Sequence, residues 1–121
     1  MLKKLFIFCI LLIVVSCSKD VQEQVLTPPP GCDSAEMHYA SDIQPIISSN
    51  CSYFGCHSPG GEGSFDYTTY AGIANRIRAG RMLDRLALPV EDPQHMPEHR
   101  AMDACQLYKL RLWIAQGYPN N

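Results

Sequence analysis

The sequence predicts a small all-α domain of three to four helices. Three segments carry apolar residues at helical spacing, and no segment shows the sustained alternation of apolar and polar residues expected of a half-buried strand. The stretches 58–67 and 89–101 are rich in glycine and proline, which favours loops. With 121 residues, the chain is long enough for one such domain.

The first sixteen residues are predicted to be a signal peptide. Two lysines precede an apolar run, Leu5 to Val15, which is too short for a comfortable membrane span and has the length of a signal peptide's hydrophobic region. Ser16 directly precedes Cys17, an arrangement that resembles the bacterial lipobox. An ordinary signal peptide cut near a cysteine is the alternative. We expect residues 1–16 to be removed and Cys17 to carry lipid outside the cytoplasm.

Residues 17–31 are predicted to be a tether, and residues 32–121 the domain. The tether is polar and ends in three consecutive prolines, which favour an extended, solvated backbone. Without the two lysines of the signal peptide, ten basic residues become eight against twelve acidic ones, a formal charge of −4. The arginines are scattered and form no basic patch of the nucleic-acid-binding type, so no nucleic-acid partner is expected.

The first helix is expected over about Asp42 to Ser49, with three isoleucines on one face. Asp42 is preferred to Ser41 as its N-cap. Pro45 then stands at the third helical position, where the N–H that proline lacks would have no partner in any case.

The second helical region is expected to start near Thr69, to break at Gly80 and to stop before Pro89. The break would divide this region into two short helices. It would therefore raise the number of helices from three to four.

The third expected segment has the clearest boundaries. Asp103 is the predicted N-cap, and Gln106 stands three residues on, in capping-box register. Met102 can pack onto Leu107 as a hydrophobic staple. The helix is expected to end at Gly117, with a proline beyond it.

Two cysteines of the domain, Cys32 at its start and Cys105 in the last helix, have no other assigned role. In an oxidising compartment such cysteines most often pair. A bridge between them would close a loop of about 74 residues, worth up to ~4.5 kcal/mol in the chain-entropy description of disulfides.

The segment NCSYFGCHSPGG, residues 50–61, predicts a cofactor. Four residues separate Cys51 from Cys56, and His57 follows directly. In a c-type haem site two cysteine sulfurs form thioethers with the haem vinyl groups, and the next histidine ligates the iron; the usual spacing between the cysteines is two residues. A local disulfide, a redox-active dithiol and a structural zinc site that recruits His95 or His99 are the alternatives.

A second candidate iron ligand lies in the loop before the last helix. A class I cytochrome needs a sixth ligand from well downstream, usually a methionine and often beside a proline. Met96 and Pro97 supply this pair 39 residues after His57. His95 and His99 flank Met96, and either could replace it; an open or water-ligated iron is the remaining alternative.

From Tyr39 to the C-terminus the chain resembles the c-type cytochrome domain of small bacterial lipoproteins, particularly those of Bacteroidota. The matching elements are YASDIQPIISSNCSYFGCHS, YTTYAGI, MP and CQLYKLRLWIAQGYPNN. The resemblance implies one covalently bound haem c, with Cys51 and Cys56 as attachment points, His57 as the proximal ligand and Met96 as the distal ligand. It also pairs a cysteine before the first helix with one in the last helix.

The resemblance further implies a cytochrome c-like fold around the haem and a lipid-anchored carrier of single electrons, with redox partner proteins in the bacterial envelope. Ser18 after Cys17 slightly favours the outer membrane. A haem peroxidase or ligand-sensing protein with a displaceable sixth ligand is the alternative from the enzyme class. A structural or zinc-binding lipoprotein is the third hypothesis.

Other residues are candidates for contact with the haem. Arginines on the second helical region could pair with a haem propionate, although a solvated helix face is the simpler interpretation for any one of them. The arginines are Arg76, Arg81 and Arg85. The apolar candidates, which would suit an ordinary core equally well, are Ile47, Tyr70, Leu110 and Trp113.

Overall fold

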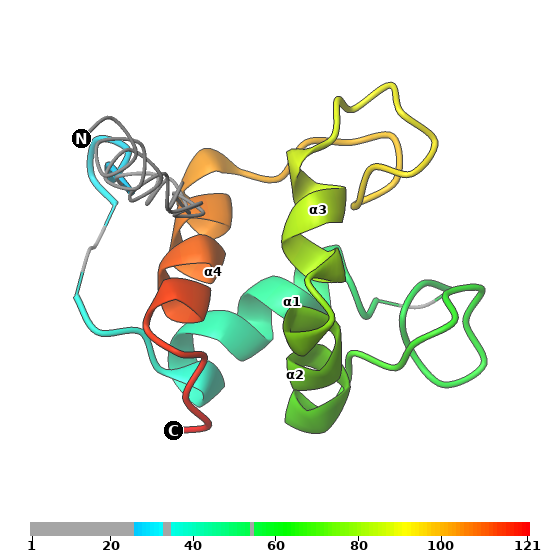
Figure 1. The fold of residues 1–121 in the computed structure, drawn as a ribbon, viewed down its shortest axis with the longest axis horizontal. Coiled ribbons are helices and arrows are strands. Elements are labelled where there is room, and N and C mark those ends of the chain that lie inside the picture. The colour runs from blue at the N-terminus through cyan, green and yellow to red at the C-terminus, as the bar shows by residue number, and fades with distance from the viewer. Residues whose placement is uncertain (1–25, 33–34, 54) are drawn as a thin grey trace, which may run out of the picture.

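The computed structural model describes residues 26–32, 35–53 and 55–121 (Figure 1). These residues form a short π-helical turn, four α-helices and no strand, so the all-α prediction is confirmed for them. The elements are η1 (Tyr39–Ile43), α1 (Gln44–Asn50), α2 (Tyr70–Arg78), α3 (Arg81–Ala87) and α4 (Ala104–Ala115). None of the described helices has the length and apolar character needed to cross a membrane. The predicted signal peptide, Cys17 and most of the tether lie outside the described residues.

The first helical segment begins earlier than predicted, at Tyr39, and Asp42 is not its N-cap. Asp42 Oδ2 instead accepts a hydrogen bond from the backbone N–H of His38 at 2.9 Å, reaching back from inside the segment. This bond is the main reason why the pKa of Asp42 is lowered. The added turn buries Tyr39 and Ile43, and this burial outweighs the local capping preference on which the prediction relied.

The second helical region has the predicted boundaries. The Thr69 hydroxyl oxygen accepts a hydrogen bond from the Gly72 N–H at 3.3 Å and caps α2. Gly80 separates α2 from α3 with a left-handed φ of 71°, and α3 ends at Ala87, ahead of Pro89. The two helices contact each other across this break.

Asp103 caps α4 as predicted, because its Oδ1 accepts hydrogen bonds from the N–H groups of Cys105 and Gln106 at 3.0 and 3.1 Å. The Gln106 side chain does not complete a capping box; its Oε1 accepts a bond from Asn50 Nδ2 at 3.0 Å. The helix is followed by Gly117 at φ 90°, where the sequence predicts its end.

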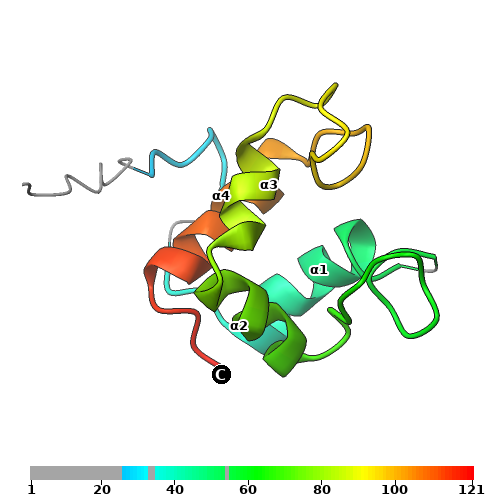
Figure 2. The same ribbon diagram turned by 45° about the vertical axis from the view of Figure 1, so that its right-hand side comes forward.

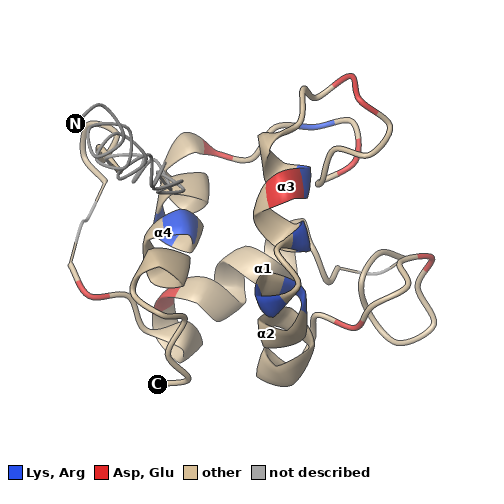
Figure 3. Cartoon of the chain, in the orientation of Figure 1, with Lys and Arg blue, Asp and Glu red and all other residues tan. Residues whose placement is uncertain are grey.

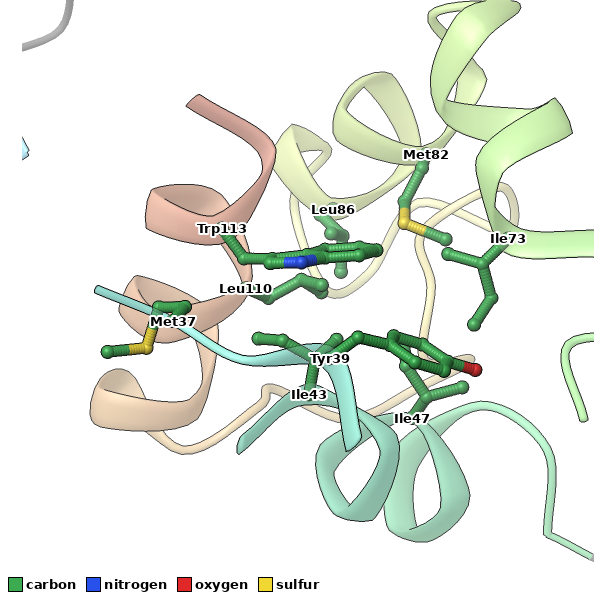
Figure 4. Close-up of a cluster of buried hydrophobic side chains, with 9 residues drawn as sticks. All are labelled: Met37, Tyr39, Ile43, Ile47, Ile73, Met82, Leu86, Leu110 and Trp113. Atoms are coloured by element: carbon green, nitrogen blue, oxygen red, sulfur yellow. The ribbon is translucent and has the colours of Figure 1, made fainter. Parts of the chain in front are cut away.

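The core gathers around Trp113, which is fully buried (Figure 4). Its ring lies 5.7 Å from the ring of Tyr39 and 6.4 Å from that of Tyr70, measured between centroids. Its Nε1–H donates to the Pro119 carbonyl at 3.0 Å. The buried cluster comprises Met37, Tyr39, Ile43, Ile47, Ile73, Met82, Leu86, Leu110 and Trp113. Met102 and Leu107, the predicted staple, both pack against this cluster.

The start of the domain is bound to its last helix and to the segment beyond it. Cys32 and Cys105 form a disulfide with their Cα atoms 5.5 Å apart, which confirms the predicted pair. The Tyr39 N–H donates to Asn121 Oδ1 at 2.9 Å. The bridge and this hydrogen bond therefore hold segments that are far apart in sequence.

The two long loops extend on the same side of the helices. The loop between α1 and α2, coloured green, and the loop between α3 and α4, coloured yellow to orange, both lie on the right in Figures 1 and 2. They correspond to the glycine-rich and proline-rich stretches of the sequence, and they carry the predicted cofactor residues.

Replacing Cys32 and Cys105 together by serine is expected to lower the free energy of unfolding by up to ~4.5 kcal/mol, because the unfolded chain regains the freedom of the closed loop. Urea unfolding of both proteins under identical conditions measures the difference. A reductant should destabilise the parent protein and leave the double variant unchanged. Equal unfolding midpoints for the two oxidised proteins would contradict this prediction.

Candidate functional site

A cavity of about 580 Å³ is lined by residues of both long loops and of α2, α3 and α4. Its volume lies within the range of small-molecule and cofactor pockets. Cys51, Cys56, His57 and Met96 all line it. Residues from two segments that are far apart in the sequence therefore meet at one hollow.

The floor of the cavity is part of the hydrophobic core. Met82, Leu86 and Leu110 line the cavity and are also members of the buried cluster. Of the apolar residues proposed from the sequence, Leu110 alone lines the cavity. The others, Ile47, Tyr70 and Trp113, belong to the core or pack against it.

The loop after α1 is folded by its own backbone hydrogen bonds. The His57 N–H donates to the Cys51 carbonyl at 2.9 Å, and the Tyr67 N–H donates to the His57 carbonyl at 2.8 Å. The Gly63 N–H donates to the Cys56 carbonyl at 3.3 Å. A Cβ at Gly63 would overlap the His57 ring, so glycine at this position leaves room for the imidazole.

The imidazole of His57 is held so that one nitrogen remains free. Its Nδ1 lies 3.2 Å from the carbonyl oxygen of Phe65. Because a carbonyl oxygen only accepts, Nδ1 carries the proton and Nε2 keeps an unshared electron pair. The ring also stacks on Tyr67, with centroids 4.3 Å apart and an interplanar angle of 23°. A fixed tautomer and a fixed ring plane are what the outer contacts of a metal-binding histidine provide.

The thiols of Cys51 and Cys56 are both free and half-buried. Burial raises the pKa of the Cys51 thiol to about 12; the nearby Arg100 opposes this rise, and Cys56 adds to it. Cys51 is therefore a protonated thiol at neutral pH. A protonated thiol is a poor nucleophile, so this environment does not favour a redox-active dithiol in which Cys51 is the reactive sulfur.

The described residues also lack a ready-made zinc site. No three side chains of histidine, cysteine, aspartate or glutamate among them are grouped so that they could hold one metal ion. In this arrangement neither His95 nor His99 joins Cys51 and Cys56 in such a group.

The loop that carries Met96 is attached to two helices. The Met96 N–H donates to the Arg85 carbonyl of α3 at 3.2 Å, and Arg85 Nη1 donates to the Gln94 carbonyl at 3.3 Å. Arg100 Nη2 donates to the Ser49 carbonyl at the end of α1, at 3.2 Å. A cation near the last carbonyls of a helix is electrostatically favourable. The hydrogen bond from Arg100 therefore joins the loop that carries Met96 to α1, the helix that leads into Cys51.

The two histidines that flank Met96 differ in position. His95 is 5% exposed, its Nδ1 lies 2.8 Å from the Pro97 carbonyl, and it does not line the cavity. His99 does line the cavity, but its side chain is 69% exposed, with Nε2 3.4 Å from Glu98 Oε1. Met96 is half-buried at the cavity wall. Of the three candidate sixth ligands, Met96 and His99 thus line the cavity, and His95 does not.

Three supporting features were not found from the sequence. The Phe65 carbonyl is a backbone group, and no residue type reveals it. Tyr67 lies in a loop without periodicity, although it belongs to the YTTYAGI segment that carries the resemblance. Met82 packs in the core and also lines the cavity, and its position in the helical pattern does not reveal this second contact.

Comparison with known proteins adds no relative. No family model matches the chain, and neither the curated proteins nor the solved structures contain a match. The resemblance to c-type cytochromes therefore remains a prediction that rests on the motif residues.

Cys51 in the haem-free protein is expected to react slowly with iodoacetamide at pH 8, because a thiol with a pKa of about 12 is almost fully protonated. Relative to the unfolded chain, the rate should fall on the order of 10³-fold. Mass spectrometry of Cys51 peptides measures the rate in buffer and in urea. Equal rates in the two conditions would show that the thiol is not shielded in the folded protein.

Proposed function

We propose that the chain is a lipid-anchored monohaem c-type cytochrome that carries single electrons in the bacterial envelope. One observation carries the proposal: Cys51, Cys56, His57 and Met96 all line a single cavity. These are the two sulfur positions, the proximal ligand and the distal ligand that the resemblance implies. Nothing in the sequence spacing requires Met96 to lie at the same hollow as the other three.

The cavity suits haem in several independent respects. Its floor is apolar, as a porphyrin face requires, and consists of Met82, Leu86 and Leu110. The free Nε2 of His57 is a suitable iron ligand because Nδ1 is engaged by a backbone carbonyl. One buried donor on the cavity wall, Arg76 Nε, has no hydrogen-bond partner among the described residues.

Each of the four residues has a distinct role in this proposal. Cys51 and Cys56 would hold haem c covalently through their sulfur atoms, and His57 and Met96 would be the ligands of its iron. When bound, haem c supplies a one-electron iron couple. The covalent links retain the cofactor in a chain too small to enclose it completely.

Met96 is the residue that favours a carrier over an enzyme. A methionine sulfur at the sixth position keeps water, peroxide and other substrates away from the iron. Thioether sulfur is a soft ligand that favours ferrous iron, so it raises the reduction potential relative to a second histidine. A peroxidase or ligand sensor would need this position open or readily vacated.

The cellular location is proposed from the sequence alone. Residues 1–16 and Cys17 have the pattern of a lipoprotein signal, and they lie outside the described residues. A lipid at Cys17 would place the domain on the membrane surface, at the end of the 17–31 tether. Its partners there would be other redox proteins of the envelope.

Expression of the full chain in a host with cytochrome c maturation machinery is expected to yield one covalently bound haem per chain, because both sulfurs lie at the cavity. A pyridine haemochrome spectrum and the intact mass of the denatured protein measure it. Cys51→Ser or Cys56→Ser should leave at most one thioether, and His57→Ala should prevent maturation. Cys32→Ser, the same replacement outside the cavity, should still carry haem. A colourless wild-type chain of unmodified mass would refute the cytochrome proposal.

Met96→Ala is expected to lower the reduction potential and to let carbon monoxide bind the ferrous protein, because the soft axial ligand is lost. The weak sulfur-to-iron charge-transfer band should disappear. Potentiometry and visible spectra measure these changes. Met102→Ala, a methionine that does not line this cavity, and His99→Ala should both behave like the parent protein.

Two outcomes would overturn the assignment of Met96. The first is a native spectrum in Met96→Ala together with an altered spectrum in His99→Ala or His95→Ala, which would identify a histidine ligand. The second is ready carbon monoxide binding by the wild-type protein, which would favour the sensor or peroxidase alternative.

A further inference from the structure

Three arginines from α2 and α3 line the same cavity: Arg76, Arg81 and Arg85. Figure 3 shows basic positions along these two helices. Glu62 and Glu98 also line this cavity. Among the described residues, however, no acidic side chain lies within salt-bridge distance of any of the three arginines; the ion pair found there joins His99 and Glu98. The chain as a whole is acidic, with a formal charge of −2, so carboxylates were available for pairing.

Arg76 is held in place but incompletely satisfied. Its guanidinium carbon lies 3.8 Å from the centre of the Phe65 ring, a cation–π contact. Burial raises the pKa of Tyr67, and the nearby Arg76 guanidinium opposes this rise. Arg76 Nε is nevertheless buried and has no hydrogen-bond partner among the described residues. A buried donor in this state costs free energy, so a hydrogen-bond acceptor is expected at the cavity.

The other two arginines have donors to spare. Arg85 uses Nη1 on the Gln94 carbonyl, which leaves the rest of its guanidinium uncommitted. Arg81 is exposed and has no hydrogen-bond or ion-pair partner in the described part of the chain. A solvated helix face would explain one such residue. Three arginines line one cavity, and one of them has a buried nitrogen without a partner among the described residues. This arrangement favours the binding of an anion.

We propose that Arg76, Arg81 and Arg85 form a carboxylate-binding site that receives the two propionate groups of the haem. This inference rests on the proposed function. The guanidinium fork matches a carboxylate in geometry and in charge, and it can bind both oxygens at once. The vinyl groups would lie toward Cys51 and Cys56 at the end of α1, and the propionates toward α2 and α3.

The site would fix the rotational orientation of the haem before the thioethers form. Neutralising the propionates would also favour the ferrous state, because their negative charge otherwise stabilises ferric iron. The three arginines would therefore be positioning residues that tune the cofactor without touching the iron.

The experiment compares holoprotein variants by resonance Raman spectroscopy, in which the propionate bending bands respond to hydrogen bonding at the carboxylates. Arg76→Gln and Arg81→Gln are expected to shift these bands and to lower the reduction potential. Arg78→Gln is the matched control: Arg78 lies on the same helix, is exposed, bonds to the Asn75 side chain and does not line the cavity. The propionate bands of Arg78→Gln should stay at the parent position, and its reduction potential should change less than that of Arg76→Gln or Arg81→Gln. Arg76→Lys, which keeps the charge but loses the fork, should give an intermediate shift.

Unchanged propionate bands in both Arg76→Gln and Arg81→Gln would overturn the inference and leave the arginines to another anion, such as an acidic partner surface. Should Arg76→Gln fail to mature, Arg81→Gln decides, because Arg81 is exposed and makes no hydrogen bond or ion pair in the described part of the chain. Failure of the inference is distinguishable from failure of the proposed function. If only the inference fails, the wild-type protein carries covalent haem, and its propionate bands do not change when the arginines are replaced. If the proposed function fails, the wild-type protein carries no haem.

Discussion

The burial of Trp113 is the interaction on which the arrangement of the helices depends. This one side chain of α4 packs against Tyr39 from η1 and Tyr70 from α2, and its only polar atom is satisfied by the Pro119 carbonyl. Aromatic pairs of this kind are worth about 0.5–1.5 kcal/mol each beyond the area that they bury. Leu110, one turn earlier on α4, is buried as well and lines the cavity. The packing of α4 therefore also determines where the cavity lies.

The two loops around the cavity are held differently, by a few polar contacts and by little burial. The Met96 loop is attached through its N–H to the Arg85 carbonyl and through Arg100 to the end of α1. A single hydrogen bond contributes only about 1 kcal/mol net, so these contacts alone hold the loops weakly. A cofactor bound covalently to Cys51 and Cys56 and ligated by both loops would add the missing cross-links. The proposed ligand would thus complete the domain as well as give it a function.

What the sequence could predict depended on how local each cause was. Caps and breaks act within a few residues, and those at Thr69, Gly80 and Asp103 were predicted correctly. The π-helical turn at Tyr39 was missed because it depends on burial against distant residues. The cysteine–histidine motif and the Met–Pro pair singled out Cys51, Cys56, His57 and Met96, which all line the cavity; their roles stay predictions. The carbonyl that orients His57 could not be predicted, since a backbone group leaves no mark in the residue types and a loop has no periodicity to locate it.

The cavity has two independent features, its sulfur and imidazole groups and its arginines, and one ligand can explain both. The cysteines, the free imidazole nitrogen and the methionine would suit the vinyl groups and the iron of the proposed haem c. The arginines suit carboxylates, because none of the three forms an ion pair within the described part of the chain. The first feature lies in the two loops and the second on α2 and α3, so neither follows from the other. Haem possesses all of these groups in one rigid molecule, and the apolar floor between the two features suits its ring.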